Sequence, residues 1–197
     1  MQTDFVIILT LILRPVQQLN RTQFVNKEQH PQIRDKNQSY LILNNISKDA
    51  NFGFLIRSAN AFGAIPVVVG RKRYSRGGAA GNTCRTPVIN YLTLKMAIDG
   101  LRERGCLICG IEIMPNAVAV TERPFKQSTA FIVGNEGEGL NASQKSHCDF
   151  FTYIPQYGSA VSLNISVATG IVLQHYGAWA NYKETERVGE KFRVQTV

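Results

Sequence analysis

Short, nearly continuous apolar runs recur along the chain, each bounded by polar residues, glycine or proline. Runs of this length without strict alternation are typical of strands that are buried on both faces of a sheet. They predict strands at residues 40–43, 65–70, 106–113, 129–134 and 150–155.

The segments between these runs carry the spacing of amphipathic helices. One apolar stripe runs through residues 52–62, another runs through residues 94–104, and a final long helix is marked on one face by Leu163, Val167 and Ile171. Alternating strands and helices predict an α/β fold, in which a mostly parallel sheet is covered by helices on both faces. In such a fold the ligand lies at the carboxyl ends of the strands.

We expect the chain to consist of three segments. Residues 16–39 are polar and rich in Gln and Asn, which predicts an N-terminal arm at 1–39. A folded domain is expected at 40–182 and a C-terminal tail at 183–197. The apolar run from Phe5 to Leu13 is shorter than the ~20 residues of a membrane-spanning helix. It also lacks the basic start and the cleavage site of a signal peptide, so we expect a docked strand or helix and no membrane.

The net charge indicates which kind of partner the protein binds, and the cysteines indicate the redox state of its compartment. The formal net charge of +8 predicts a basic surface, for which nucleic acid is the first candidate and simple solubility is the alternative. Four scattered cysteines favour a reducing compartment, the cytoplasm first, with nucleus and organelle left open. Cys106 and Cys109 lie three apart in a predicted strand and should point to opposite faces, which argues against a shared metal.

A glycine-rich segment, GNEGEGL at residues 134–140, follows one predicted strand. Its spacing is neither that of a dinucleotide-binding turn nor that of a P-loop, which argues against a nucleotide-dependent oxidoreductase. Glu136 and Glu138 would repel a pyrophosphate, so a ligand with positive charge fits better. A purely structural turn is the alternative.

Two other segments place polar residues after predicted strands. In IPQYGSAVSLNISVA, at residues 154–168, Ser162 could be an ordinary helix N-cap and Asn164 a first-turn residue, or the two could orient a hydroxyl group. In the third segment, residues 44–63, Arg57 lies in an apolar helical pattern, where it either reaches a site or pairs with an acid.

Taken together and in this order, the three segments resemble the signature motifs of the SpoU (TrmH-like) family of SPOUT RNA 2′-O-ribose methyltransferases. The resemblance implies a homodimeric α/β domain with a C-terminal deep trefoil knot, a rare exception to unknotted topology. It also implies S-adenosylmethionine as cofactor and structured RNA as substrate, with tRNA favoured over rRNA. The alternative is a catalytically inactive SpoU-like module for RNA binding or assembly.

The resemblance also implies a set of site residues. The catalytic set would be Asn51, Arg57, Glu136, Ser162 and Asn164. The cofactor would contact Gly134, Asn135, Glu136, Gly137, Ile154, Pro155, Gly158, Ser162 and Leu163, the last through its backbone. No metal is expected, because the histidines show no ligand spacing.

A basic loop after the predicted strand at 65–70 is the best candidate for contact with RNA. Its cations would hold phosphates and its tyrosine could stack on a base, the residues being Arg71, Lys72, Arg73, Tyr74 and Arg76. A solvated basic loop without a partner is the alternative.

Overall fold

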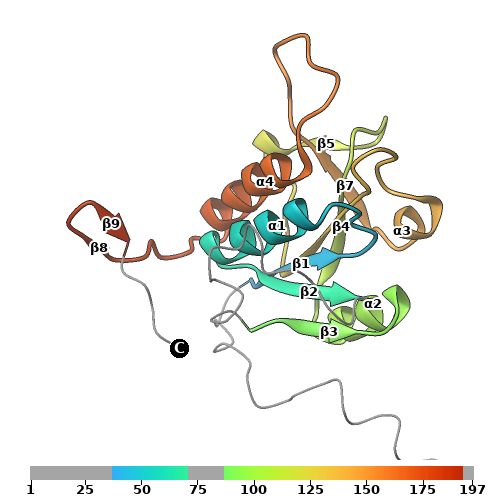
Figure 1. The fold of residues 1–197 in the computed structure, drawn as a ribbon, viewed down its shortest axis with the longest axis horizontal. Coiled ribbons are helices and arrows are strands. Elements are labelled where there is room, and N and C mark those ends of the chain that lie inside the picture. Colours follow the sequence, from blue (N-terminus) through green and yellow to red (C-terminus); the bar gives the residue numbers. More distant parts are fainter. Residues whose placement is uncertain (1–36, 71–86, 193–197) are drawn as a thin grey trace, which may run out of the picture.

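A seven-stranded parallel sheet forms the centre of the protein, in a computed structural model that describes residues 37–70 and 87–192 (Figure 1). The strand order is β3-β2-β1-β6-β4-β7-β5. The strands are β1 (Ser39–Leu43), β2 (Ile65–Val69), β3 (Ile89–Tyr91), β4 (Leu107–Ile111), β5 (Val118–Ala119), β6 (Thr129–Val133) and β7 (Phe150–Tyr153). The five predicted strands are therefore confirmed, together with the parallel sheet.

Helices cover both faces of this sheet, as predicted. The long helices are α1 (Asp49–Ala61), α2 (Leu94–Arg102) and α4 (Ile165–Trp179), and shorter elements are η3 (Val120–Glu122) and α3 (Ala142–Ser146). Helices α1 and α4 lie side by side on one face, and α2 lies on the other (Figure 1). The apolar stripe predicted for residues 52–62 is the buried side of α1.

The core has two halves because side chains alternate across each strand. On β1, Leu41 and Leu43 pack towards α1 and α4, whereas Tyr40 and Ile42 pack towards α2. The same alternation separates the two cysteines of the CxxC, since Cys109 belongs to the first half and Cys106 to the second. Both thiols are free.

An aromatic cluster ties the end of α4 to the start of β1. Tyr176 packs edge-on against Phe125 and Phe131, and its hydroxyl lies 3.2 Å from the carbonyl oxygen of Gln38. The Tyr182 hydroxyl accepts a 2.9 Å hydrogen bond from the Ser39 amide. These contacts hold the first and last parts of the domain together.

Helix α4 differs from the predicted pattern in two respects. It begins at Ile165, so Leu163 lies before it. Its buried side is formed by Thr169, Val172, Leu173 and Tyr176. The predicted apolar face, which includes Val167 and Ile171, is the outer side of the helix, and Val167 is 51% exposed.

The order of the strands determines which segments meet. Strand β1 pairs with β6, and β4 lies between β6 and β7. Because all these strands are parallel, their carboxyl ends share one edge of the sheet. The segments that follow β1, β6 and β7 therefore start at the same edge, where the ligand of an α/β sheet is expected.

A short hairpin follows the domain. Strands β8 (Arg187–Val188) and β9 (Lys191–Phe192) pair with each other and stand away from the sheet (Figure 1). Within the described part of the chain, no helix is long and apolar enough to cross a bilayer. The same residues contain no cluster of three or more potential metal ligands.

Candidate functional site at the carboxyl edge of the sheet

Three side chains from the three motif segments form one hydrogen-bonded chain. The side-chain nitrogen of Asn51 donates to Glu136 Oε1 at 3.0 Å, and the side-chain nitrogen of Asn164 donates to Asn51 Oδ1 at 3.2 Å. A carboxylate can only accept, so Asn51 must direct its nitrogen to Glu136 and its oxygen to Asn164. The direction of every bond in the chain is therefore fixed by the negative charge of Glu136.

Glu136 also holds the start of α1. Its carboxylate accepts from the backbone amides of Ser47 and Lys48, both at 3.1 Å. Lys48 is the N-cap of α1 and provides no side-chain cap, and the Glu136 carboxylate lies at this end of the helix, where negative charge is favourable. Partial desolvation acts to raise the pKa of Glu136, but these hydrogen bonds and the one from Asn51 outweigh it and lower the pKa overall.

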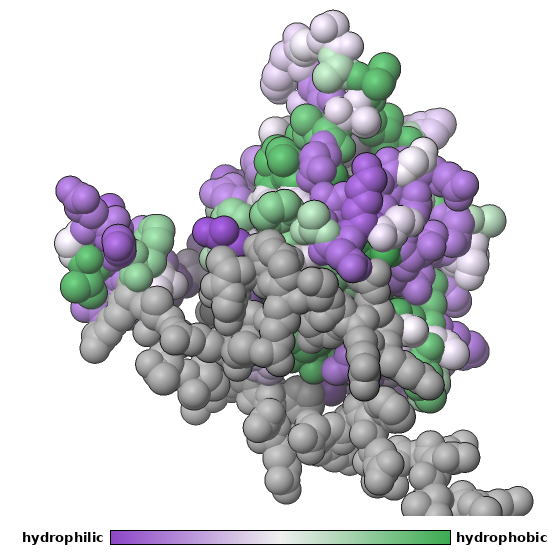
Figure 2. Space-filling view, viewed as in Figure 1, coloured by the Kyte–Doolittle hydropathy of each residue, from purple (hydrophilic) through white to green (hydrophobic). Residues whose placement is uncertain are grey.

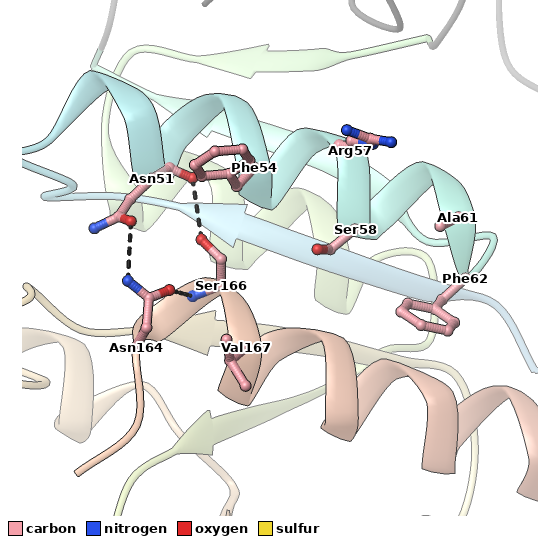
Figure 3. A pocket seen from close by; sticks show the side chains of 9 residues that line it. All are labelled: Asn51, Phe54, Arg57, Ser58, Ala61, Phe62, Asn164, Ser166 and Val167. Carbon is pink, nitrogen blue, oxygen red and sulfur yellow. Dashed lines mark hydrogen bonds between the residues drawn. The ribbon is translucent and has the colours of Figure 1, made fainter. Parts of the chain in front are cut away.

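The N-cap of α4 is Asn164, not Ser162 as the capping alternative supposed. Asn164 Oδ1 accepts from the Ser166 amide at 2.8 Å, while its nitrogen reaches Asn51. One amide side chain thus caps α4 and joins it to α1 (Figure 3). Ser166, which sequence reasoning missed, adds a 3.4 Å hydrogen bond from its hydroxyl to the Asn51 carbonyl oxygen.

Arg57 also lies on α1 but is apart from this chain of hydrogen bonds, and its side chain points away from α4 (Figure 3). Its side chain is exposed, and it makes no hydrogen bond or ion pair with residues 37–70 or 87–192. The expected pairing of Arg57 with an acid is therefore absent from the described part of the chain. The guanidinium is free to contact a ligand or another chain.

A cavity of about 470 Å³ opens between α1 and α4 beside these residues (Figure 3). Asn51, Asn164 and Ser166 lie at one end of the cavity, and Ala61 and Phe62 lie at the other (Figure 3). Its lining consists of Asn51, Phe54, Arg57, Ser58, Ala61, Phe62, Asn164, Ser166 and Val167. The space-filling view shows apolar side chains mixed with hydrophilic ones over α1 and α4, and mainly hydrophilic ones over α3 (Figure 2).

The glycine-rich turn after β6 is tightly closed. Asn135 and Gly139 exchange two backbone hydrogen bonds of 2.9 and 3.0 Å. A Cβ atom on Gly134 would lie 2.0 Å from the Gly139 carbonyl carbon, so only glycine fits there. The Asn135 side chain donates to Ser47 Oγ at 2.7 Å and accepts from the Gly137 amide at 2.9 Å. The turn is thereby attached to the segment that follows β1.

A further carboxylate, missed in the sequence, lies at this turn. Glu112 is the first residue after β4, and its Oε2 accepts from the Leu140 amide at 2.8 Å. Gly139 adopts a φ of +69°, and a Cβ atom there would lie 2.6 Å from the same oxygen. The rule that ligands lie at the carboxyl ends of strands could have drawn attention to Glu112, because this acid is the second-last residue of the apolar run at 106–113.

The third motif segment behaves differently from the other two. Ile154 and Pro155 are partly buried, but residues 157–164 are exposed, and Tyr157 and Val161 reach 94% exposure. Gly158, Ser162 and Leu163 belong to this protruding loop (Figure 1). Among the described residues, no hydrogen bond joins the backbone of 156–163 to the turn at 134–140. The structure thus brings Asn51, Glu136 and Asn164 together and leaves Ser162 and Leu163 apart.

The basic loop proposed for RNA lies outside the residues that the structure describes. Arg71, Lys72, Arg73, Tyr74 and Arg76 all fall in this gap.

A parallel sheet with glycine-rich and polar segments at its carboxyl edge is typical of α/β proteins that bind a ligand at that edge. The chain belongs to the SpoU rRNA Methylase family, which matches residues 38–174. This match includes the described site residues, from Asn51 to Asn164.

Among curated proteins, the chain is 37% identical over 139 residues to the 23S rRNA (guanosine-2′-O-)-methyltransferase RlmB of Coxiella burnetii. The match covers 68% of this chain and 55% of that protein, so the chain spans about half the length of this relative.

Two solved structures have the same fold. One is the SpoU methyltransferase AviRb from Streptomyces viridochromogenes in complex with the cofactor AdoMet, with a TM-score of 0.65 and 24% identity over 75% of this chain and 62% of that one. The other is the A. aeolicus TrmH/SpoU tRNA modifying enzyme, with a TM-score of 0.63 and 26% identity over 73% and 76%. The deep knot expected from the resemblance is implied by this shared fold.

Proposed function

We propose that this chain transfers a methyl group from S-adenosylmethionine to a ribose 2′-hydroxyl of a structured RNA. The observation that carries the proposal is the hydrogen-bonded chain of Glu136, Asn51 and Asn164, which joins all three motif segments at the ligand edge of the sheet. Family membership supports the same reaction, and AviRb was solved with AdoMet bound.

The chemistry of the site fits a cationic cofactor. Glu112, Glu136 and Glu138 surround the glycine-rich turn with negative charge, and no basic residue lies within the segment 134–140. A sulfonium and an ammonium group would be attracted to this edge, whereas a pyrophosphate would be repelled. We assign the cofactor to the backbone at Gly134 and Ile154, with Asn135, Gly137 and Pro155 shaping the walls. Gly158 and Leu163, which the resemblance also implied, lie in the protruding loop and are left out of this assignment.

The mechanism requires placement of the ribose more than any covalent step by the protein. When bound, S-adenosylmethionine supplies a methyl group on a positively charged sulfur, which leaves as a neutral thioether. A hydroxyl group must be held in line with that methyl group and must lose its proton. We assign the orientation of the ribose to Asn51 and Asn164, which are joined by a hydrogen bond, and the shape of the turn to Glu136.

Arg57 is assigned to an RNA phosphate. A guanidinium stays protonated in proteins, so it is poorly suited to be the base. Its exposure on α1, without a partner in the described part of the chain, leaves its donors available for bidentate contact with phosphate oxygens. The positive charge would also favour the ionised hydroxyl, and the proton would leave through the phosphate or solvent.

A second copy of the chain is the partner that we propose for the surface over α1 and α4. Helix α4 is apolar on both sides, which is typical of a helix buried on both sides. Phe54 and Val167, at 45% and 51% exposure, border the cavity between the helices. A homodimer would cover this surface and bring a second chain next to Arg57.

The RNA class needs a direct comparison. The compact domain makes tRNA the first substrate to test, and the name of the RlmB relative makes 23S rRNA the second. Incubation of the protein with each RNA and with methyl-labelled S-adenosylmethionine, followed by nucleoside mass spectrometry, tests the proposal. Label on a ribose 2′-oxygen supports it, and label on neither RNA contradicts it.

A further inference from the structure

The site contains a carboxylate to which the three motif segments give no role. Glu112 follows β4, and β4 is flanked in the sheet by β6 and β7, the two strands that lead into the proposed cofactor segments. The backbone amide of Glu112 donates to the Thr152 carbonyl oxygen of β7 at 3.1 Å, while its side chain reaches the turn after β6. Glu112 therefore connects the two sides of the site.

The Glu112 carboxylate contacts the turn through a short hydrogen bond and a close fit beside Gly139. Oε2 accepts from the Leu140 amide at 2.8 Å, a length typical of a hydrogen bond to a charged acceptor. The carboxylate also fills the space beside Gly139, where a side chain would collide with it. Leu140 itself is buried in the half of the core that contains α2, so the anchored amide lies at the point where the turn enters the core.

We propose that Glu112 is a positioning residue for the cofactor site, and that its carboxylate holds the turn at 134–140 in the shape that receives the methyl donor. This inference rests on the proposed function for the identity of that donor. Glu112 acts through the Leu140 amide, so its loss should loosen the turn before any ligand is bound.

The test compares three variants of the full chain. Glu112→Ala removes the acceptor. Glu112→Gln retains an oxygen that can accept from Leu140. Glu103→Ala removes an exposed glutamate at the end of α2 and is the matched control. Hydrogen exchange of peptides covering 134–141 is measured without cofactor, and S-adenosylmethionine affinity, KM and kcat are measured with it.

Glu112→Ala removes one hydrogen bond to a charged acceptor. We therefore expect hydrogen exchange of the Leu140 amide to become about tenfold faster, and the Kd and KM for S-adenosylmethionine to rise about tenfold. The kcat at saturating cofactor and the affinity for RNA should change less than about twofold. Glu112→Gln should restore most of the lost affinity, and Glu103→Ala should match the wild type.

Wild-type exchange rates in Glu112→Ala would overturn the anchor, whatever the cofactor result. A Glu112→Gln variant as impaired as Glu112→Ala would overturn it as well, because the hydrogen bond would then not be the cause. If the wild-type protein does not bind S-adenosylmethionine, the proposed function and the cofactor part of this inference are wrong. The exchange rates would still show whether Glu112 holds the Leu140 amide. If Glu112→Ala does not fold, Glu112→Asp, whose shorter side chain should not reach Leu140, takes its place.

Discussion

Asn51 and Asn164, which lie 113 positions apart on two different helices, are joined by a 3.2 Å hydrogen bond between their side chains. Asn51 is only 7% exposed, and its other side-chain atom donates to Glu136. The pair thus connects the N-terminal ends of α1 and α4 to the glycine-rich turn. A change in any one member should affect the other two.

Replacement of Asn51 by Ala tests this connection. It removes the partner of both Glu136 and Asn164, so we expect a loss of about 1–3 kcal/mol in the free energy of unfolding and a fall of about 10²-fold in methyl transfer. Asn60→Ala, on the same helix, is the control and should cost less than about 0.5 kcal/mol. Urea unfolding and single-turnover methylation measure the two effects. Equal behaviour of the two variants would contradict the role of Asn51.

The lowered pKa of Glu136 should make the free energy of unfolding depend on pH in the acidic range. Its folded pKa is lowered below the ordinary value of 4.5, so the unfolded state binds more protons and stability rises with pH. The contribution is complete above the unfolded pKa and is lost as the pH falls through the folded pKa. Glu136→Gln should therefore weaken the fall of the unfolding free energy as the pH drops below the ordinary carboxylate value of 4.5. Urea unfolding at a series of pH values measures this slope, and a Glu136→Gln variant with the wild-type slope would contradict the role of the carboxylate.

Alanine substitutions at Gly134 and Gly137, which lie in the same turn, should have opposite effects on stability. A Cβ atom on Gly134 would meet the backbone of Gly139 and Leu140 at 2.0–2.3 Å, whereas one on Gly137 would meet only Asn135 Oδ1 at 3.6 Å. Gly134→Ala should lower the melting temperature by several degrees and abolish S-adenosylmethionine binding. Gly137→Ala should keep the wild-type melting temperature. Calorimetry measures both quantities, and a stable Gly134→Ala variant would disprove the packing argument.

The proposed dimer is tested on α4. Val167 and Met96 are similarly exposed, at 51% and 49%, but Val167 borders the α1–α4 cavity and Met96 lies on α2. Val167→Glu would bury a charge in the interface and should yield a monomer in sedimentation, because an unpaired buried charge is costly. Met96→Glu should sediment like the wild type, as a dimer. A monomeric wild-type protein would contradict the proposal.

The sequence predicted the elements with long apolar patterns and missed those without one. Strands β3 and β5 contain three and two residues, and α3 contains five, too few to show a period. Val167 and Ile171 were placed on one face, but the pattern could not tell that α4 is apolar on both sides. Its inner side is defined by contacts with Phe125 and Phe131, which come from other elements.

For the site, motif order indicated Asn51, Glu136 and Asn164 but not their contacts. The bonds depend on β1 and β6 being neighbours, and long-range pairing leaves no local pattern in the sequence. Glu112 was missed because it contacts the site only through strand order, and Ser166 because its contact with Asn51 requires α1 and α4 to pack together. The sequence pattern also could not predict that Ser162 lies in an exposed, protruding loop.

Arg57 provides the most direct test of the whole account, because it is the charged side chain among the described residues that is assigned to the substrate. Single-turnover transfer of labelled methyl from S-adenosylmethionine to RNA ribose should be present in the wild type and should fall more than about tenfold in Arg57→Lys, which keeps the charge but loses the bidentate contact. Arg123→Lys, at an exposed position away from α1, is the control. Near-normal ribose methylation by Arg57→Lys, or no ribose methylation by the wild type, would contradict the account.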